Sequence, residues 1–173
     1  FFTDISNYIA YEMGQPTHSY DFDSLADSNI SLTNKITEDK FKTLLGKNIE
    51  LDGTDMVFMN QNKIINLAGI VGGMDTSCSK ETKSVLVECA YFLPESIIGR
   101  ALKYNIQSDA SHKFERGVDP QCQEKVLRRF IQIVSEHSTI TKAAIYTNSS
   151  STFKDTELDI NLDSINAILG INE

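Results

Sequence analysis

The chain has 173 residues, 40% of them hydrophobic and 23% charged, which is enough for one globular domain with a real core and a small appendage. Its net charge of −8 argues against strong non-specific binding to nucleic acid, so we expect no DNA partner. No apolar run approaches the length of a membrane span, so we expect no membrane partner either.

The cysteines and the first residues bear on the cellular compartment. Cys78, Cys89 and Cys122 are odd in number and form no C-x-x-C motif, which argues against a disulfide framework and against a zinc site. The chain begins with neither a methionine nor a basic region, so its start does not resemble a signal peptide. We therefore expect an internal fragment of a longer cytoplasmic protein that binds no metal in this part.

In chain order, the pattern predicts one helix and then a β-rich region. Apolar residues at helical spacing predict a helix over residues 4–13, which Gly14 ends. Alternating and β-branched residues predict strands within residues 30–92, with a hairpin over residues 56–65. Residues 84–90 are the strongest candidate for a buried strand.

The second half of the chain reads as helices followed by one strand. A helix is expected over residues 94–104, and a longer one over residues 120–137, capped by Asp119 with Pro120 at its first position. Residues 140–146 suggest a strand. Strands and helices without strict alternation predict an α+β fold rather than a doubly wound α/β fold.

The charge is unevenly distributed along the chain. Residues 100–129 carry seven cations and four anions, so this segment is +3 and the remainder is −11. Such a segment is either a solvated helix face or a local contact for RNA, and the charge pattern alone favours the solvated face.

Two residues stand out by their surroundings. Glu88 lies inside the apolar strand 84–90, where an unpaired carboxylate is costly, so it must have a partner, be protonated or face a pocket, unless the strand is an edge with Glu88 in solvent. His18 lies in an expected loop just before two polar residues, Tyr20 and Asp21. It suits a base, a hydrogen-bond donor or a ligand, although a structural hydrogen bond is the commoner role.

A glycine cluster and a polar cluster are the other candidates. Gly69, Gly72 and Gly73 permit backbone amides to approach a ligand, but they also suit a tight turn. Ser108 and the small Ala110 open a stretch dense in hydroxyls, acids and cations. The sequence has no G-x-S-x-G motif, which argues against a serine–histidine hydrolase.

Four motifs together resemble a known family. They are residues 14–21 (GQPTHSYD), 67–73 (LAGIVGG), 87–92 (VECAYF) and 108–120 (SDASHKFERGVDP). In this order and spacing they resemble the editing domain of the bacterial phenylalanyl-tRNA synthetase β subunit, over residues 3–136. The resemblance implies a compact layered domain of mixed sheets with flanking helices.

The resemblance also implies roles for individual residues. It makes Glu88 the acid that recognises a tyrosine hydroxyl, and Gly72 and Ala110 small residues that leave room in the substrate pocket. Gly69 and Gly73 join them as substrate-binding residues. His18 and Ser108 take the catalytic positions, where Ser108 replaces a more common threonine and retains its hydroxyl.

The implied function is proofreading of tRNA charging. The domain is expected to hydrolyse tyrosine from the 3′ end of tRNA(Phe), without a cofactor of its own, within an (αβ)2 phenylalanine–tRNA ligase that uses ATP and Mg. The alternative is an editing-inactive module with a structural role or a role in binding tRNA or the α subunit.

The same resemblance divides the chain. Residues 1–147 are expected to form the editing domain and residues 148–156 a linker. Residues 157–173 are expected to begin the next module of the β chain.

Overall fold

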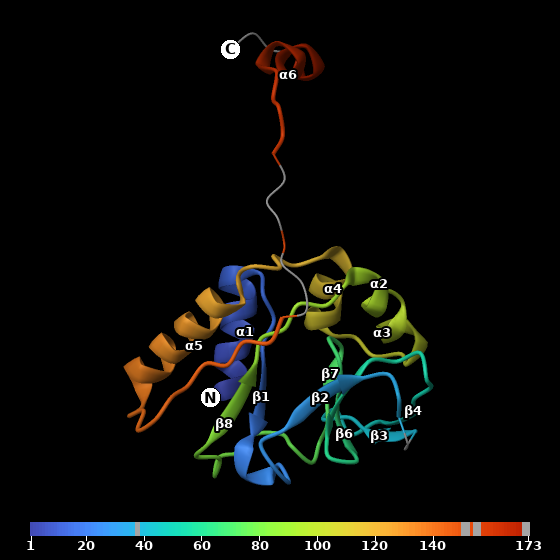
Figure 1. The fold of residues 1–173 in the computed structure, drawn as a ribbon, viewed down its shortest axis with the longest axis vertical. Helices are drawn as coiled ribbons and strands as arrows, with labels where there is room; N and C mark the ends of the chain where they lie inside the picture. Colours follow the sequence, from blue (N-terminus) through green and yellow to red (C-terminus); the bar gives the residue numbers. More distant parts are fainter. Residues whose placement is uncertain (37–38, 150–152, 154–156, 171–173) are drawn as a thin grey trace.

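The computed structural model describes residues 1–36, 39–149, 153 and 157–170. Within them, antiparallel sheets lie beside helices that cover one flank and one end of the sheets (Figure 1). The α+β prediction is confirmed. None of the helices in the described residues is long and apolar enough to cross a membrane.

The largest sheet has four antiparallel strands in the order β2-β5-β6-β7. They are β2 (Ile30–Thr33), β5 (Val57–Asn60), β6 (Lys63–Leu67) and β7 (Val71–Gly72). The predicted hairpin is confirmed as β5–β6, and Gln61 in its turn has a φ of 53°. Because β5 is buried throughout, this sheet forms the centre of the larger hydrophobic core.

Two ribbons of two strands complete the β-structure. In one, β1 (His18–Asp21) pairs with β8 (Val85–Glu88), and in the other, β3 (Lys40–Lys42) pairs with β4 (Asn48–Glu50). A 3-10 turn, η1 (Phe22–Ser24), follows β1 directly. The expectation of a loop at His18 was therefore wrong, since His18 begins a strand. β8 is half-buried rather than buried, because only one strand pairs with it.

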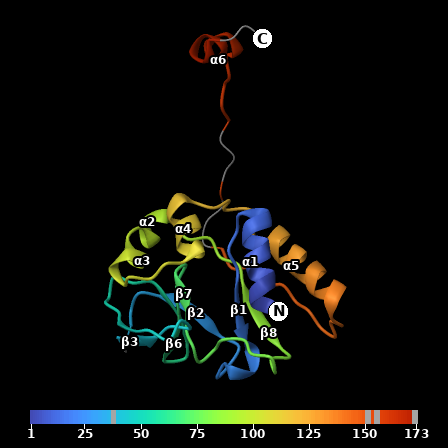
Figure 2. The ribbon, with the colours of Figure 1, turned by 180° about the vertical axis from the view of Figure 1, so that it is seen from behind.

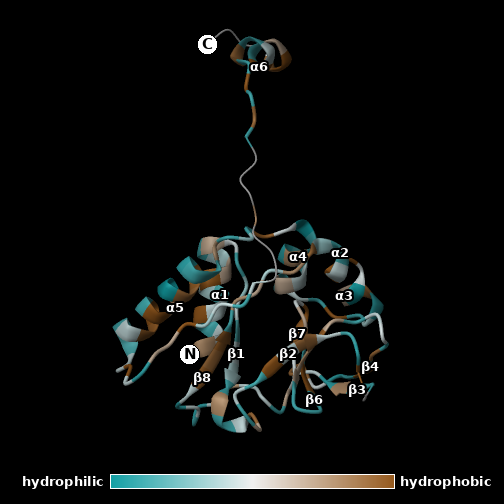
Figure 3. Cartoon of the chain, in the orientation of Figure 1, coloured by the Kyte–Doolittle hydropathy of each residue, from teal (hydrophilic) through white to brown (hydrophobic). Residues whose placement is uncertain are grey.

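Two helices pack on each other and on the β1–β8 ribbon to form a second core. They are α1 (Phe2–Met13) and α5 (Gln123–His137), which lie side by side in Figures 1 and 2. Figure 3 shows hydrophobic and hydrophilic residues alternating around α5, which buries only one face. The core residues are Ile5, Ile9, Val126, Phe130 and Ile133.

The start of α5 differs from the prediction. The helix begins at Gln123, three residues after the expected position, and Cys122 is its N-cap. The carboxylate of Asp119 instead accepts a hydrogen bond from the backbone N–H of Gln121 at 2.8 Å. This local turn uses the side chain that was expected to cap the helix.

Three short helices cover the end of the large sheet. They are α2 (Pro94–Ile97), α3 (Arg100–Lys103) and α4 (Asp109–Arg116). The single helix predicted over residues 94–104 was wrong, because Gly99 has a φ of 77° and divides it. Glycine adopts that conformation readily because it has no Cβ atom.

The last part of the described chain carries one more helix and no strand. The strand predicted over residues 140–146 is absent, since no neighbouring strand in the described residues supplies hydrogen bonds to it. Helix α6 (Leu162–Leu169) buries none of its residues and lies apart from the rest of the fold in Figure 1. The proposed linker, residues 148–156, lies largely outside the described residues, so the domain boundaries stay predictions.

Candidate functional site

The pairing of β1 with β8 places His18 directly opposite Glu88. Residues opposite each other in an antiparallel pair project their side chains from the same face, and so do residues two apart in one strand. His18, Glu88 and Tyr20 therefore share a face of this ribbon. The rings of His18 and Tyr20 meet edge to face, with their centroids 4.5 Å apart.

A chain of hydrogen bonds connects Glu88 to the large sheet. The hydroxyl of Tyr20 donates to Glu88 Oε2 at 3.2 Å, and Asn66 Nδ2 donates to the same hydroxyl at 2.9 Å. Tyr20 is fully buried and Asn66 is 4% exposed, whereas Glu88 is half-buried. Glu88 was a candidate from the sequence and Asn66 was not, although Asn66 is a polar residue inside the apolar run of β6.

The environment of Glu88 favours its neutral form. Burial raises the pKa of the Glu88 carboxyl to about 7, and the hydrogen bond from Tyr20 opposes that rise. Neither an ion pair nor a hydrogen bond to a Lys or Arg reaches this carboxyl within the described residues. Glu88 therefore changes charge near neutral pH, which is unusual for a carboxylic acid and typical of functional sites.

His18 is held neutral above Gly72. Burial lowers the pKa of the His18 imidazole to about 4, and its Nε2 atom is buried with no hydrogen-bond partner among the described residues. A Cβ atom added to Gly72 would lie 2.5 Å from Nε2 and 3.1 Å from Leu44 Cδ2. The absence of a side chain at Gly72 is therefore what lets the imidazole occupy this position.

The structure gives Gly69 and Gly73 packing roles. Gly69 has a φ of 72°, and a Cβ there would lie 2.8 Å from Ile97 Cδ1. A Cβ on Gly73 would lie 2.9 Å from the backbone oxygen of Ile65. Both glycines are required by contacts within the protein, and their approach to a substrate stays a prediction.

Ser108 and Ala110 lie at the start of α4. The Ser108 hydroxyl caps this helix by accepting a hydrogen bond from the backbone N–H of Ser111 at 3.3 Å. Ala110 is partly buried against the larger core, which also contains Tyr20. No hydrogen bond joins Ser108 to His18 or Glu88 in the described residues, and the site roles of Ser108 and Ala110 stay predictions.

Most cations of the basic segment are already paired. Lys103 contacts Asp52 and Asp55, and Arg100 lies 3.9 Å from Asp55. On α5, two arginines pair with glutamates: Arg128 with Glu124, and Arg129 with Glu12 of α1. This pairing supports the solvated face over a contact for RNA.

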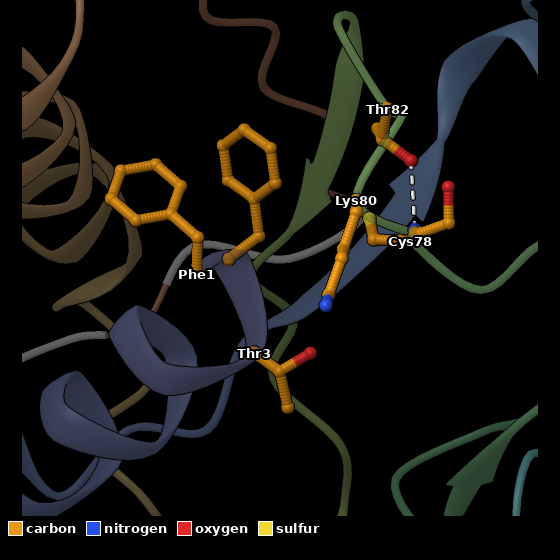
Figure 4. A pocket seen from close by; sticks show the side chains of 7 residues that line it. Phe1, Thr3, Cys78, Lys80 and Thr82 are labelled. Carbon is orange, nitrogen blue, oxygen red and sulfur yellow. Dashed lines mark hydrogen bonds between the residues drawn. The ribbon is translucent and has the colours of Figure 1, made fainter.

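A cavity of about 480 Å³ lies beside the N-terminal end of α1 (Figure 4). It is lined by Phe1, Phe2, Thr3, Cys78, Ser79, Lys80 and Thr82. A second space of about 460 Å³ lies between α1 and α5. Neither contains a residue that the sequence analysis assigned to the site.

The structure is an α+β domain whose β1–β8 ribbon places a histidine opposite a carboxyl. The family model of the B3/4 domain matches residues 1–139, and the chain belongs to this family.

Comparison with curated proteins is more specific and confirms the resemblance to the phenylalanyl-tRNA synthetase β subunit. The chain is 32% identical over 174 residues to the phenylalanine–tRNA ligase beta subunit of Francisella tularensis, covering 99% of this chain and 22% of that protein. It is 40% identical over 132 residues to the beta subunit of Pectobacterium atrosepticum, covering 76% of this chain and 16% of that protein. The chain thus spans about a fifth of the length of these curated relatives.

Proposed function

We propose that this chain is the editing unit of a cytoplasmic phenylalanine–tRNA ligase β subunit and hydrolyses the ester of tyrosyl-tRNA(Phe). The observation that carries the proposal is Glu88, a half-buried carboxyl that no cation of the described residues reaches, opposite a neutral histidine. The tRNA and the α subunit of an (αβ)2 enzyme are the proposed partners, and ATP and Mg belong to the ligase reaction of the whole enzyme.

Glu88 provides the discrimination that such a site requires. Tyrosine exceeds phenylalanine by one hydroxyl, which an apolar synthetic pocket rejects poorly. A carboxylate that accepts a hydrogen bond from that hydroxyl favours tyrosine. Phenylalanine in the same place would leave one carboxylate oxygen desolvated and without a donor, at a cost of about 1–3 kcal/mol.

Hydrolysis of the ester requires no covalent bond between the substrate and the protein. An aminoacyl ester is already activated, so orienting a water molecule and stabilising the oxyanion with backbone amides is sufficient. His18 is neutral at pH 7, and its buried Nε2 has no hydrogen-bond partner among the described residues. We assign this atom to the water or the terminal adenosine, as the acceptor of a proton or a hydrogen bond. Ser108 is the second group assigned to the water, and no covalent nucleophile is required.

The test compares Glu88→Ala with Glu50→Ala in the intact synthetase that carries this chain. Glu50 is a matched control because it is an exposed glutamate on a strand. Hydrolysis of tyrosyl-tRNA(Phe) and phenylalanyl-tRNA(Phe) is followed by release of the labelled amino acid. We expect Glu88→Ala to lose tyrosine release about tenfold or more while Glu50→Ala retains it. No tyrosine release by the unmodified enzyme would reject the editing function and favour a structural or binding role.

A further inference from the structure

We propose that Asn66 and Tyr20 are positioning residues that hold Glu88 with one carboxylate oxygen occupied and the other open to a ligand hydroxyl. The inference rests on the proposed function and deepens it. It assigns the open oxygen, Oε1, to a substrate that donates from an aromatic hydroxyl.

The direction of the hydrogen bonds follows from the groups involved. The nitrogen of an asparagine amide only donates, so Asn66 Nδ2 occupies a lone pair of the Tyr20 hydroxyl. The single hydrogen of that hydroxyl is then available to Glu88 Oε2. The series runs from Asn66 through Tyr20 to Glu88, and it makes Glu88 an acceptor.

The burial of the intermediate groups makes this series rigid. Tyr20 is fully buried, and the ring of His18 packs against it edge to face. Asn66 lies opposite Gly72 in the β6–β7 pairing, and Gly72 in turn supports His18. The residues proposed to recognise the hydroxyl and to orient water are therefore fixed through the same two strands.

One oxygen of Glu88 remains for a ligand. Oε2 receives the hydroxyl of Tyr20, whereas Oε1 has no hydrogen-bond partner among the described residues. A half-buried carboxylate with one oxygen held by a phenol accepts a second phenol at the other oxygen, since an ionised carboxylate has about four acceptor sites. A substrate ring without a hydroxyl leaves Oε1 unsatisfied, which is the basis of the selectivity.

The test uses two variants of the intact synthetase that affect the series at different points. Tyr20→Phe removes the hydroxyl and retains the ring. Asn66→Asp keeps the shape but replaces a donor by an acceptor, so the new carboxylate draws the hydrogen of Tyr20 away from Glu88. Tyr11→Phe is the control, because Tyr11 is 90% exposed.

The readout is the ratio of kcat/KM for tyrosyl-tRNA(Phe) to kcat/KM for phenylalanyl-tRNA(Phe), together with separate KM and kcat values. We expect both variants to lower this ratio by about tenfold, mainly by raising KM for the tyrosyl substrate, with Tyr11→Phe unchanged. A merely structural role would lower hydrolysis of both substrates together. Thermal unfolding checks that each variant is folded, and Tyr20→Phe decides the matter if Asn66→Asp does not fold.

The outcomes separate this inference from the proposed function. If Glu88→Ala loses selectivity but Tyr20→Phe keeps the kcat/KM ratio of the parent enzyme, the positioning role is overturned and the editing function stands. A parental ratio in folded Asn66→Asp overturns the direction assigned to the hydrogen bonds, since an acceptor at that position would then be tolerated. Absence of tyrosine release from the parent enzyme rejects both.

Discussion

Among the described residues, two carboxyl groups receive a hydrogen bond from a buried tyrosine, and they differ in what else surrounds them. Asp55 is 1% exposed and accepts from the Tyr104 hydroxyl, from the backbone N–H of Asp52 at 2.9 Å and from Lys103 at 3.2 Å. Glu88 has a tyrosine but no cation and no backbone donor among the described residues. All three donors go to Asp55 Oδ2, whereas Oδ1 has no hydrogen-bond partner among the described residues and lies 3.9 Å from Arg100 Nη1. The charge of Asp55 is therefore compensated by two cations and joins the turn after β4 to α3, whereas no cation of the described residues compensates Glu88.

The difference teaches how to separate a structural carboxylate from a functional one. A buried charge with paired cations and backbone donors stabilises one conformation, and removing its charge leaves those partners unpaired. A carboxyl that burial alone has shifted gains its missing partner from a ligand or from a proton. A carboxyl left without such partners lowers the stability of the fold, so its presence indicates a binding role.

The largest effect is expected from Asp55→Asn. The substitution retains the shape, but it removes the charge facing Lys103 and offers a donor where several donors already converge. We expect the free energy of unfolding to fall by about 3–5 kcal/mol at pH 8, measured by urea denaturation. A loss below about 1 kcal/mol would contradict the view that this cluster is structural.

The matching substitution at the other carboxyl, Glu88→Gln, is expected to act in the opposite direction. The pKa of Glu88 rises from 4.5 in the unfolded chain to about 7 in the fold, so the folded protein binds this proton more tightly. Its contribution to stability is present below pH 4.5 and is lost as the pH rises through 7. The variant should be more stable than the parent by about 1–3 kcal/mol at pH 8 and equal to it below pH 4.5.

Urea denaturation of the parent and of Glu88→Gln at several pH values tests this pH dependence of their stability difference. Other titrating groups near Glu88, namely His18, Tyr20 and Cys89, are present in both proteins, so their contributions cancel in the difference. A constant difference between the two proteins from pH 4 to pH 8 would falsify the raised pKa.

A third substitution, Gly72→Ala, tests what supports His18. The added methyl would overlap the imidazole, so we expect the ring to move toward solvent and stability to fall by about 1–2 kcal/mol. The pKa of His18, followed by NMR, should rise from about 4 toward 6.5. Gly53→Ala is the control, because nothing lies within 4 Å of a Cβ there. An unmoved His18 titration in Gly72→Ala would show that the imidazole does not depend on this glycine.

Sequence patterns predicted the parts of the fold that local rules decide. The helix that Gly14 ends and the β5–β6 hairpin depend on periodicity and on turn residues, which neighbours in the sequence supply. Glu88 was also identifiable, because a carboxyl inside an apolar strand is conspicuous by itself. Its hydrogen-bond partner, Tyr20, could not be identified from the sequence.

The missing information lies in long-range contacts and in competing local ones. Asn66 and Tyr20 are 46 residues apart, and no local pattern brings them together. The predicted helix 94–104 is divided because Gly99 adopts the left-handed conformation. A glycine permits this conformation but does not require it, so the sequence alone could not predict the break. The Asp119 carboxylate could accept a hydrogen bond either from the first turn of a helix or from a tight turn. It accepts one from the backbone N–H of Gln121 in a tight turn.

The smallest effect is expected from an ion pair that is as short as any between the described residues. Arg128 and Glu124 lie 2.6 Å apart on α5, but their side chains are 69% and 60% exposed. Water already solvates both charges, and holding two long side chains together costs conformational entropy, so Arg128→Gln should change the free energy of unfolding by less than about 0.5 kcal/mol. High salt should reduce the change further. A loss as large as that of Asp55→Asn would mean that distance rather than burial sets the strength of these pairs, and the contrast between Asp55 and Glu88 would lose its physical basis.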